Sequence, residues 1–333
     1  MSLTNAQISE LLALESDRQE DRKAKALRRA ARMALEWPVE VAALVADGGS
    51  PTDLVSVGPY TAGLIMGWLG DPPEVPDPPP LRAGFITLAA ARAAMATDPG
   101  RMPLADLQMH TVDSDGNATL EEMVAACRRY EFIAITDHTK GLQIAGGMDE
   151  EGFAVQGRAI DALNEGRAEP PRVLKSMEMN LDPEGQGDME PDVFAGLDLV
   201  LGAFHSKLRL KEDQTARYQA AIRNRTVDVL AHPRCRMFNF RLGLTADWDV
   251  VFQTAADEGM VLEIDCHPNR QDLNVELLKV AKDYEVTFSI GTDAHSVDEL
   301  AFMEIGIGAS ILAGIPRERV LNLNPWAGAP RRR

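Results

Sequence analysis

Short apolar segments alternate with amphipathic segments from about residue 104 onward, and this alternation constrains the fold more than any other feature. The segments with strand character are 104–109, 132–136, 173–177, 197–204, 227–231, 260–264 and 287–291. The helical stretches between them include 119–130, 149–165, 213–224, 247–258, 273–283 and 297–313. Seven repeated strand–helix units predict a closed or nearly closed parallel (β/α) barrel. A doubly wound open sheet is the alternative, but no GxGxxG follows the first strand and no GxxxxGK[ST] occurs.

A proline-rich stretch separates this region from the N-terminal part of the chain. Residues 71–80, DPPEVPDPPP, hold six prolines, which exclude a helix or a central strand and predict an extended linker. Before it, apolar residues recur at helical spacing and good helix formers fill 24–35. We therefore predict a small all-α domain over residues 1–70, a linker and connection over 71–103, and the barrel over 104–333.

The charge of the chain is strongly acidic but unevenly distributed. The formal net charge is −17 and the pI is about 4.8, which argues against a general nucleic-acid coat protein. Residues 1–70 carry 9 acids and 7 bases, and all of these bases lie within residues 18–32. This basic stripe could contact DNA phosphates, or it could be the solvated face of a helix that packs on its own domain.

The cysteines and the hydropathy indicate the compartment. The three cysteines, Cys127, Cys235 and Cys266, are widely spaced and form no CxxC pair, so neither a disulfide scaffold nor a structural zinc finger is expected. No run approaches 18 consecutive apolar residues, and the N-terminus does not resemble a signal peptide. We expect a cytoplasmic monomer with no membrane segment.

Histidines and carboxylates gather at the ends of the predicted strands. Five of the six histidines follow a strand in this way: His110, His138, His205, His232 and His295. The carboxylates at these positions are Asp115, Asp137, Glu178 and Asp293. In a parallel barrel all these strand ends meet on one rim. One histidine after a strand is more often a satisfied polar residue than a ligand, but five on one rim predict a site for divalent metals.

The number of potential ligands exceeds the four that complete a single tetrahedral zinc site, so we predict a multi-metal cluster. Such a cluster can generate hydroxide at neutral pH and stabilise both oxygens of a phosphoryl transfer. It would also supply the positive charge that an acidic protein needs to bind an anionic substrate. The basic residues that follow the same strands are candidates for phosphate binding: Lys140, Lys207, Arg236 and Arg270. Ordinary solvated rim residues are the alternative, and the two arginines are favoured for bidentate contacts.

These motifs, in order, resemble the PHP (polymerase and histidinol phosphatase) superfamily. The resemblance extends from about residue 104 to 322 and rests on Asp106–Thr111, Ser114-Asp115-Gly116, Ile135–His138, Glu178, His205-Ser206, Ala231-His232-Pro233 and Gly291–His295. It implies a distorted seven-stranded (β/α) barrel of PHP type that hydrolyses phosphoesters with two or three divalent metal ions, manganese, zinc or iron.

The resemblance also implies a role for each ligand. Glu178 would be the bridging carboxylate, and His110 and Asp293 would help to hold one metal. His205 and His232 would hold the second metal. The third would be held by Asp115, His138 and His295. A metal-bound water held by His110, Glu178 and Asp293 would attack phosphorus.

The chain is most similar to the PHP module at the end of bacterial family-X DNA polymerases. Residues 4–69 resemble the helical helix–hairpin–helix domain at the start of those polymerases, with Leu54–Gly58 as the hairpin. The polymerase palm is missing, because the proline-rich linker and about twenty residues take its place, too few for such a domain. The resemblance therefore implies an enzyme that acts on DNA ends without polymerising.

The chain departs from the family at three positions. Gln108 replaces the first histidine of a His-x-His pair and offers only a weak amide-oxygen ligand. Ser56 replaces a hairpin glycine, which can impede close approach to a phosphate. No lysine occurs between Lys25 and Lys140 to form a Schiff base, so we expect no lyase activity.

We therefore expect a metal-dependent phosphoric ester hydrolase, acting as a 3′–5′ exonuclease or 3′-end processing enzyme on single-stranded or gapped DNA. Two alternatives remain open. One is a small-molecule phosphatase of the histidinol-phosphate type. The other is a non-catalytic DNA-repair adaptor whose metal site is weakened by Gln108. Neither Cys266 nor His267 receives a role.

Overall fold

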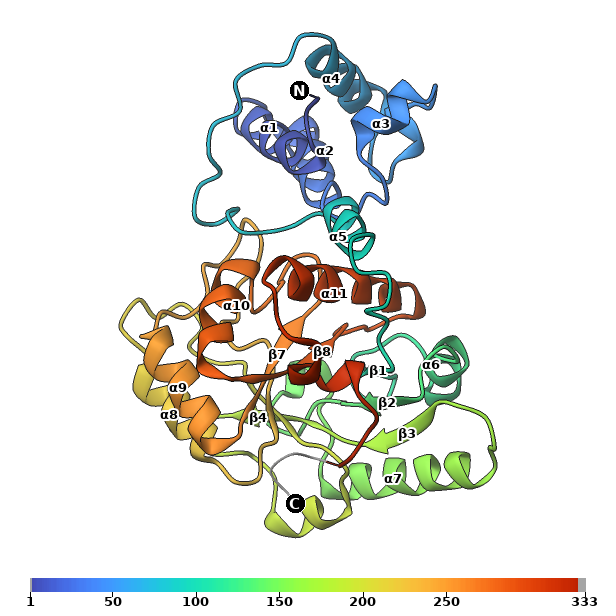
Figure 1. The fold of residues 1–333 in the computed structure, drawn as a ribbon, viewed down its shortest axis with the longest axis vertical. Helices are drawn as coiled ribbons and strands as arrows, with labels where there is room; N and C mark the ends of the chain where they lie inside the picture. The colour runs from blue at the N-terminus through green and yellow to red at the C-terminus, as the bar shows by residue number, and fades with distance from the viewer. Residues whose placement is uncertain (1, 329–333) are drawn as a thin grey trace.

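The computed structural model describes residues 2–328 and shows two groups of secondary structure joined by a long connection (Figure 1). The N-terminal group contains α1 (Asn5–Asp17), α2 (Asp21–Met33), α3 (Val41–Ala46), a 3-10 turn (Pro51–Asp53) and α4 (Pro59–Gly70). After it, residues 72–79 hold neither helix nor strand, and α5 (Leu88–Met95) leads into the larger group. The connection that we predicted over 71–103 thus contains one helix.

The larger group is an α/β body. Its strands are β1 (Ala105–Asp106), β2 (Phe132–Ile135), β3 (Arg172–Lys175), β4 (Glu178–Leu181), β5 (Leu201–Phe204), β6 (Val229–Leu230), β7 (Val261–Asp265) and β8 (Thr287–Gly291). Its helices are α6 (Leu120–Ala126), α7 (Glu150–Glu165), α8 (Thr215–Arg223), α9 (Trp248–Glu258), α10 (Val275–Ala281) and α11 (Met303–Leu312). A 3-10 helix, Val297–Phe302, precedes α11, so the helix predicted over 297–313 is two elements.

All strand pairs are parallel, and they form two sheets, in the orders β1-β2-β3 and β4-β5-β6-β7-β8. The strand predicted over 173–177 corresponds to β3. After Ser176 and Met177 the chain continues into β4 of the second sheet, a strand that was not predicted. At the opposite edges, Leu107 N donates to Ile290 O at 3.3 Å. The strand ladder does not run continuously around the sheets, so the α/β class is confirmed while the closed barrel stays a prediction.

The strands are buried on both faces. Every residue of β2, β5 and β7 is buried, which is expected of parallel strands covered by helices. One hydrophobic cluster lies between the strands and their helices, and includes Ile133, Phe252 and Ile290. A second cluster uses the alternate residues of the same strands, such as Ala134 and Val261. Because the carboxyl ends of these strands point the same way, the residues that follow them meet at one rim.

The N-terminal helices have a hydrophobic cluster of their own, with Leu12, Leu27, Trp37 and Ile65 fully or almost fully buried. In the predicted hairpin, Ser56 has a φ of 66°. This left-handed conformation favours glycine, so a serine is less easily accommodated here than a glycine would be.

The connection is anchored to both groups. Arg82 donates two hydrogen bonds to the Glu10 carboxylate of α1, both at 2.7 Å. Gln271 pairs with both backbone groups of Ile86 at 2.8 Å. Helix α5 then packs against α11 so closely that a Cβ on Gly308 would lie 2.6 Å from Ala91 Cα. Among the described residues, no helix has the length and apolar character needed to cross a bilayer.

Candidate metal centre

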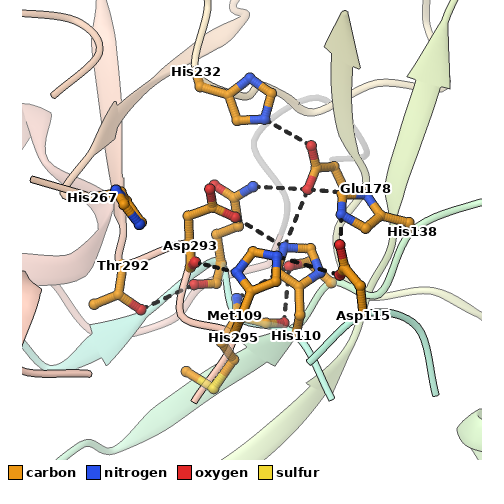
Figure 2. Close-up of polar contacts among 12 residues, drawn as sticks. Met109, His110, Asp115, His138, Glu178, His232, His267, Thr292, Asp293 and His295 are labelled. Carbon is orange, nitrogen blue, oxygen red and sulfur yellow. Dashed lines mark hydrogen bonds and ion pairs between the residues drawn. The ribbon is translucent and has the colours of Figure 1, made fainter. Parts of the chain in front are cut away.

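The eight predicted histidine and carboxylate ligands lie close together where the strands β1, β2, β5, β6 and β8 end and β4 begins. Figure 2 labels all of them except His205. His110 and Asp115 follow β1, His138 follows β2, Glu178 begins β4, His205 follows β5, His232 follows β6, and Asp293 and His295 follow β8. Three sets have ligand atoms within 4.8 Å of one another: His110, Asp115, His138 and His295; His138, Glu178 and His205; and His110, Glu178 and Asp293.

Glu178 lies at the centre of the cluster and is fully buried. Its Oε1 is 2.8 Å from His232 Nε2 and 3.1 Å from His205 Nε2. Its Oε2 is 3.3 Å from His110 Nε2 and 3.5 Å from His138 Nδ1. Burial would raise the pKa of Glu178, but the surrounding imidazoles lower it well below its usual value. A carboxylate held charged between four imidazoles can bridge two cations.

Asp293 contacts His110, one of the four histidines around Glu178. Its Oδ1 lies 3.0 Å from His110 Nε2, and its Oδ2 forms an ion pair with Arg270. Burial would raise the pKa of Asp293, but Arg270 and His110 lower it well below its usual value. Conversely, burial would lower the pKa of His110, but hydrogen bonds to Asp293 and Glu178 raise it well above its usual value. Because metal ligands must be deprotonated, a cation that binds here would displace a proton.

The remaining imidazoles are oriented by their second nitrogen. His205 Nδ1 lies 3.2 Å from Asn180 Oδ1, and His295 Nδ1 lies 2.8 Å from the carbonyl oxygen of Asp293. In both rings Nε2 therefore faces a carboxylate, Glu178 at 3.1 Å and Asp115 at 3.3 Å respectively. This arrangement fixes the ring tautomer in many metal sites.

Gln108 reaches the same cluster, as its position in the sequence predicted. Its Nε2 donates to Glu178 Oε2 at 3.0 Å, and its Oε1 is buried without a hydrogen-bond partner among the described residues. A buried carbonyl oxygen with no donor is an available ligand, although a weak one for a borderline metal. The donor set of imidazole, carboxylate and amide oxygen fits divalent cations.

The four predicted phosphate-binding residues have different surroundings. Arg270 contacts the cluster through Asp293. Lys140 is paired with Glu150 at 2.6 Å, and Lys207 is exposed on the loop after β5. The guanidinium of Arg236 is buried against the connection, where it lies 3.6 Å from the centroid of the Phe85 ring. A buried guanidinium that stacks on an aromatic ring stabilises the docking of the connection.

Two residues support the cluster in ways that the sequence does not reveal. Asp137, one of the predicted strand-end carboxylates, accepts four hydrogen bonds from the loop before Asp115 and from α7. Asn180 has no motif that would reveal its contact with His205. His267 lies beside the cluster, where burial and Arg270 lower its pKa to about 4, and its ring packs edge-on against Phe302.

No protein-family model matches the chain. The DNA polymerase/3′-5′ exonuclease PolX of Bacillus subtilis is 37% identical over 220 residues, which are 65% of this chain and 38% of that protein. The probable phosphatase YcdX of Escherichia coli K12 is 23% identical over 228 residues, 66% of this chain and 90% of that protein. A probable phosphatase of Caldicellulosiruptor saccharolyticus is 28% identical over 212 residues, 59% of this chain and 82% of that protein.

One solved structure is also similar to the chain. It is a histidinol phosphate phosphatase from Lactococcus lactis, complexed with zinc, L-histidinol and phosphate. The TM-score is 0.43 and the sequence identity 14%, over 61% of this chain and 90% of that chain. The chain thus spans less than half of the Bacillus polymerase but most of the length of the phosphatases.

Proposed function

Because the chain belongs to the polymerase and histidinol phosphatase superfamily, we propose that its buried histidine and carboxylate cluster is the metal centre of a phosphoester hydrolase. The observation that carries this proposal is Glu178, a fully buried carboxylate with four imidazoles within 3.5 Å. Burying so many polar and charged groups costs desolvation energy, which contacts among the side chains alone do not fully offset. Binding of cations would offset this desolvation energy.

Each part of the cluster has a proposed task. Glu178 would bridge the ions, His110 and Asp293 would hold one ion, and His205 and His232 would hold a second. The set of Asp115, His138 and His295 would hold a third. When bound, the ions supply Lewis acidity and activate water. Arg270, whose side chain is about a quarter exposed, keeps Asp293 ionised and offers its remaining N–H groups to a phosphate.

We propose that the substrate is a DNA 3′ end. The similarity to a relative named as a DNA polymerase/3′-5′ exonuclease supports this proposal, together with the N-terminal helices and their basic stripe. We further propose that residues 1–70 are a separate domain and that the two sheets form the distorted barrel of the superfamily. A small-molecule phosphatase is the second candidate, because the relatives named as probable phosphatases match over most of their length.

The experiment supplies purified protein and Mn²⁺ with 5′-labelled single-stranded and gapped DNA, and in parallel with a panel of phosphomonoesters. Stepwise shortening that is lost in Asp293→Ala and His138→Ala, but kept in the surface control Arg158→Gln, supports the exonuclease. Release of phosphate without DNA shortening supports the phosphatase. Inactivity on both substrates, with fewer than two ions per purified chain, contradicts the proposed metal centre.

A further inference from the structure

Two loops at the rim are basic although the rest of the α/β body is acidic. Residues 205–211, after β5, and 231–246, after β6, contain six bases and no Asp or Glu. These bases are Lys207, Arg209, Lys211, Arg234, Arg236 and Arg241. The loops begin with His205 and His232, so they border the metal centre directly. A local positive field next to the cluster favours an anionic ligand.

An exposed aromatic ring stands on the second of these loops. Met237 and Arg241 exchange two backbone hydrogen bonds, at 2.8 and 2.9 Å, and thereby close a tight turn. At its tip, Asn239 has a φ of 51° and donates its backbone N–H to Leu81 O at 2.8 Å. Phe240 projects from this fixed turn with 56% of its surface exposed. A large ring that is rigidly held and left in solvent is a suitable stacking platform.

Phe238, the other aromatic residue of the turn, is buried rather than exposed. Its ring packs edge-on against Phe85, with the ring centroids 5.1 Å apart. Its backbone N–H donates to Asn269 O at 2.7 Å. Because Phe238 already anchors the turn, the exposed Phe240 is not needed to hold it in place.

Arginines connect this ring with the metal centre. The Arg209 guanidinium lies 4.7 Å from the centroid of the Phe240 ring. Burial lowers the pKa of Arg241, and the nearby positive charges of Arg270 and Arg209 lower it further. The guanidinium of Arg241 therefore lies within electrostatic reach of Arg209 and of Arg270, and Arg270 contacts Asp293. Among residues 2–328, neither Arg209 nor Arg241 has a carboxylate within ion-pair distance.

We propose that Phe240, Arg209 and Arg241 form a binding surface for the end of a single-stranded nucleic acid. An unpaired base stacks on Phe240, and the phosphates lie along the arginines toward the metal centre. In a duplex the faces of the internal bases are covered by the neighbouring base pairs, so the surface favours single strands. This inference rests on the proposed function, because it supplies the substrate of the same site.

The test measures binding rather than hydrolysis. A short fluorescein-labelled oligothymidylate is titrated with the full-length protein in EDTA, and anisotropy gives Kd. Phe240→Ala is expected to weaken binding about 5- to 150-fold, the value of one stacked base, while Phe240→Trp retains it. Arg209→Gln is expected to reduce the slope of log K against log salt by about 0.7.

The matched controls lie on α7, away from the two loops. The exposed fraction of Val155, 53%, is similar to that of Phe240, and Arg158 is an exposed arginine like Arg209. Val155→Ala and Arg158→Gln should therefore leave Kd unchanged. An unchanged Kd in Phe240→Ala, or equal weakening of a duplex, overturns the inference. Failure of the wild-type protein to bind the oligonucleotide also overturns it. Binding without any Mn²⁺-dependent shortening overturns the proposed function and leaves the binding surface intact.

Discussion

Asp137 supports the loop that carries Asp115, and replacing it tests whether that support matters for metal binding. Its Oδ1 accepts from Thr111 N at 2.8 Å and from Ser114 Oγ at 2.5 Å. Its Oδ2 accepts from Thr111 Oγ1 and from Gln156 Nε2, both at 2.7 Å. All four donors reach one fully buried carboxylate. The substitution Asp137→Asn keeps the shape of this side chain and removes its charge.

The cost follows from the donors. Thr111 N–H cannot reverse its polarity, so the asparagine oxygen has to face it, and the amide NH2 then meets Thr111 Oγ1 and Gln156. The hydroxyl can rotate and accept, but the bond from Gln156 Nε2 is lost. The other bonds fall from the charged range of about 1.5–3 kcal/mol to the neutral range of about 0.5–1.5 kcal/mol. We expect unfolding to become easier by roughly 2–4 kcal/mol.

The functional effect should be confined to one ion. Loosening the loop displaces Asp115 from His138 and His295, so affinity for the cation held by these three should fall about 10- to 100-fold. Isothermal titration with Mn²⁺ measures it. The control is Asp182→Asn, whose carboxylate accepts from two backbone N–H groups of an exposed turn. Unchanged Mn²⁺ affinity in a folded Asp137→Asn protein would refute the reasoning.

Three further predictions concern Gln108, Asp106 and the ion pair between Arg82 and Glu10. Gln108→His should raise Mn²⁺ affinity in titration calorimetry, because imidazole is a better ligand than the amide oxygen; an unchanged affinity would show that the side chain does not reach the ion. Burial raises the pKa of Asp106 from 3.8 to about 6, partly offset by Thr292. The protonated Asp106 therefore stabilises the fold, and its contribution is complete below pH 3.8. The free energy of unfolding falls by about 3 kcal/mol as the pH rises from 3.8 through about 6. Asp106→Asn should remove this fall, measured by urea unfolding at each pH. Arg82→Met leaves the Glu10 carboxylate buried without its partner and should lower the free energy of unfolding by about 3–5 kcal/mol. Adding Glu10→Gln to this variant should restore part of the loss. Equal unfolding midpoints for the wild type, the single variant and the double variant would contradict this.

The elements and the cluster were accessible from the sequence for one physical reason. Parallel strands place their carboxyl ends on one rim, so a histidine such as His110 or His232 is located by the strand before it. Strand lengths were less accessible, because hydrogen-bond pairing decides where a strand ends. The segment predicted over 197–204 is a strand only from Leu201, and the division between β3 and β4 has no local signal.

The supporting contacts could not be predicted, because each depends on residues that meet only after folding. Asn180 follows no motif, yet its amide oxygen orients His205 from 25 positions away. The four donors to Asp137 come from positions 111, 114 and 156. Local patterns report which side of a strand a residue occupies, whereas these contacts depend on which loops approach one another.

Arg236 and Arg270 show the same limit on the substrate side. Both follow a strand end and a histidine, and nothing in the sequence distinguishes them, yet Arg236 is buried whereas the side chain of Arg270 is about a quarter exposed. Arg270 forms an ion pair with Asp293, which follows the neighbouring strand β8. Arg236 instead stacks on Phe85 of the connection, some 150 residues earlier in the chain. Burial lowers the pKa of Arg236 to about 10, although Asp272 partly opposes this shift, whereas Asp293 more than offsets the effect of burial and keeps the pKa of Arg270 raised. Because Arg270 contacts the metal centre through Asp293 whereas Arg236 packs against Phe85 on the connection, we propose Arg270 rather than Arg236 as the phosphate-binding arginine.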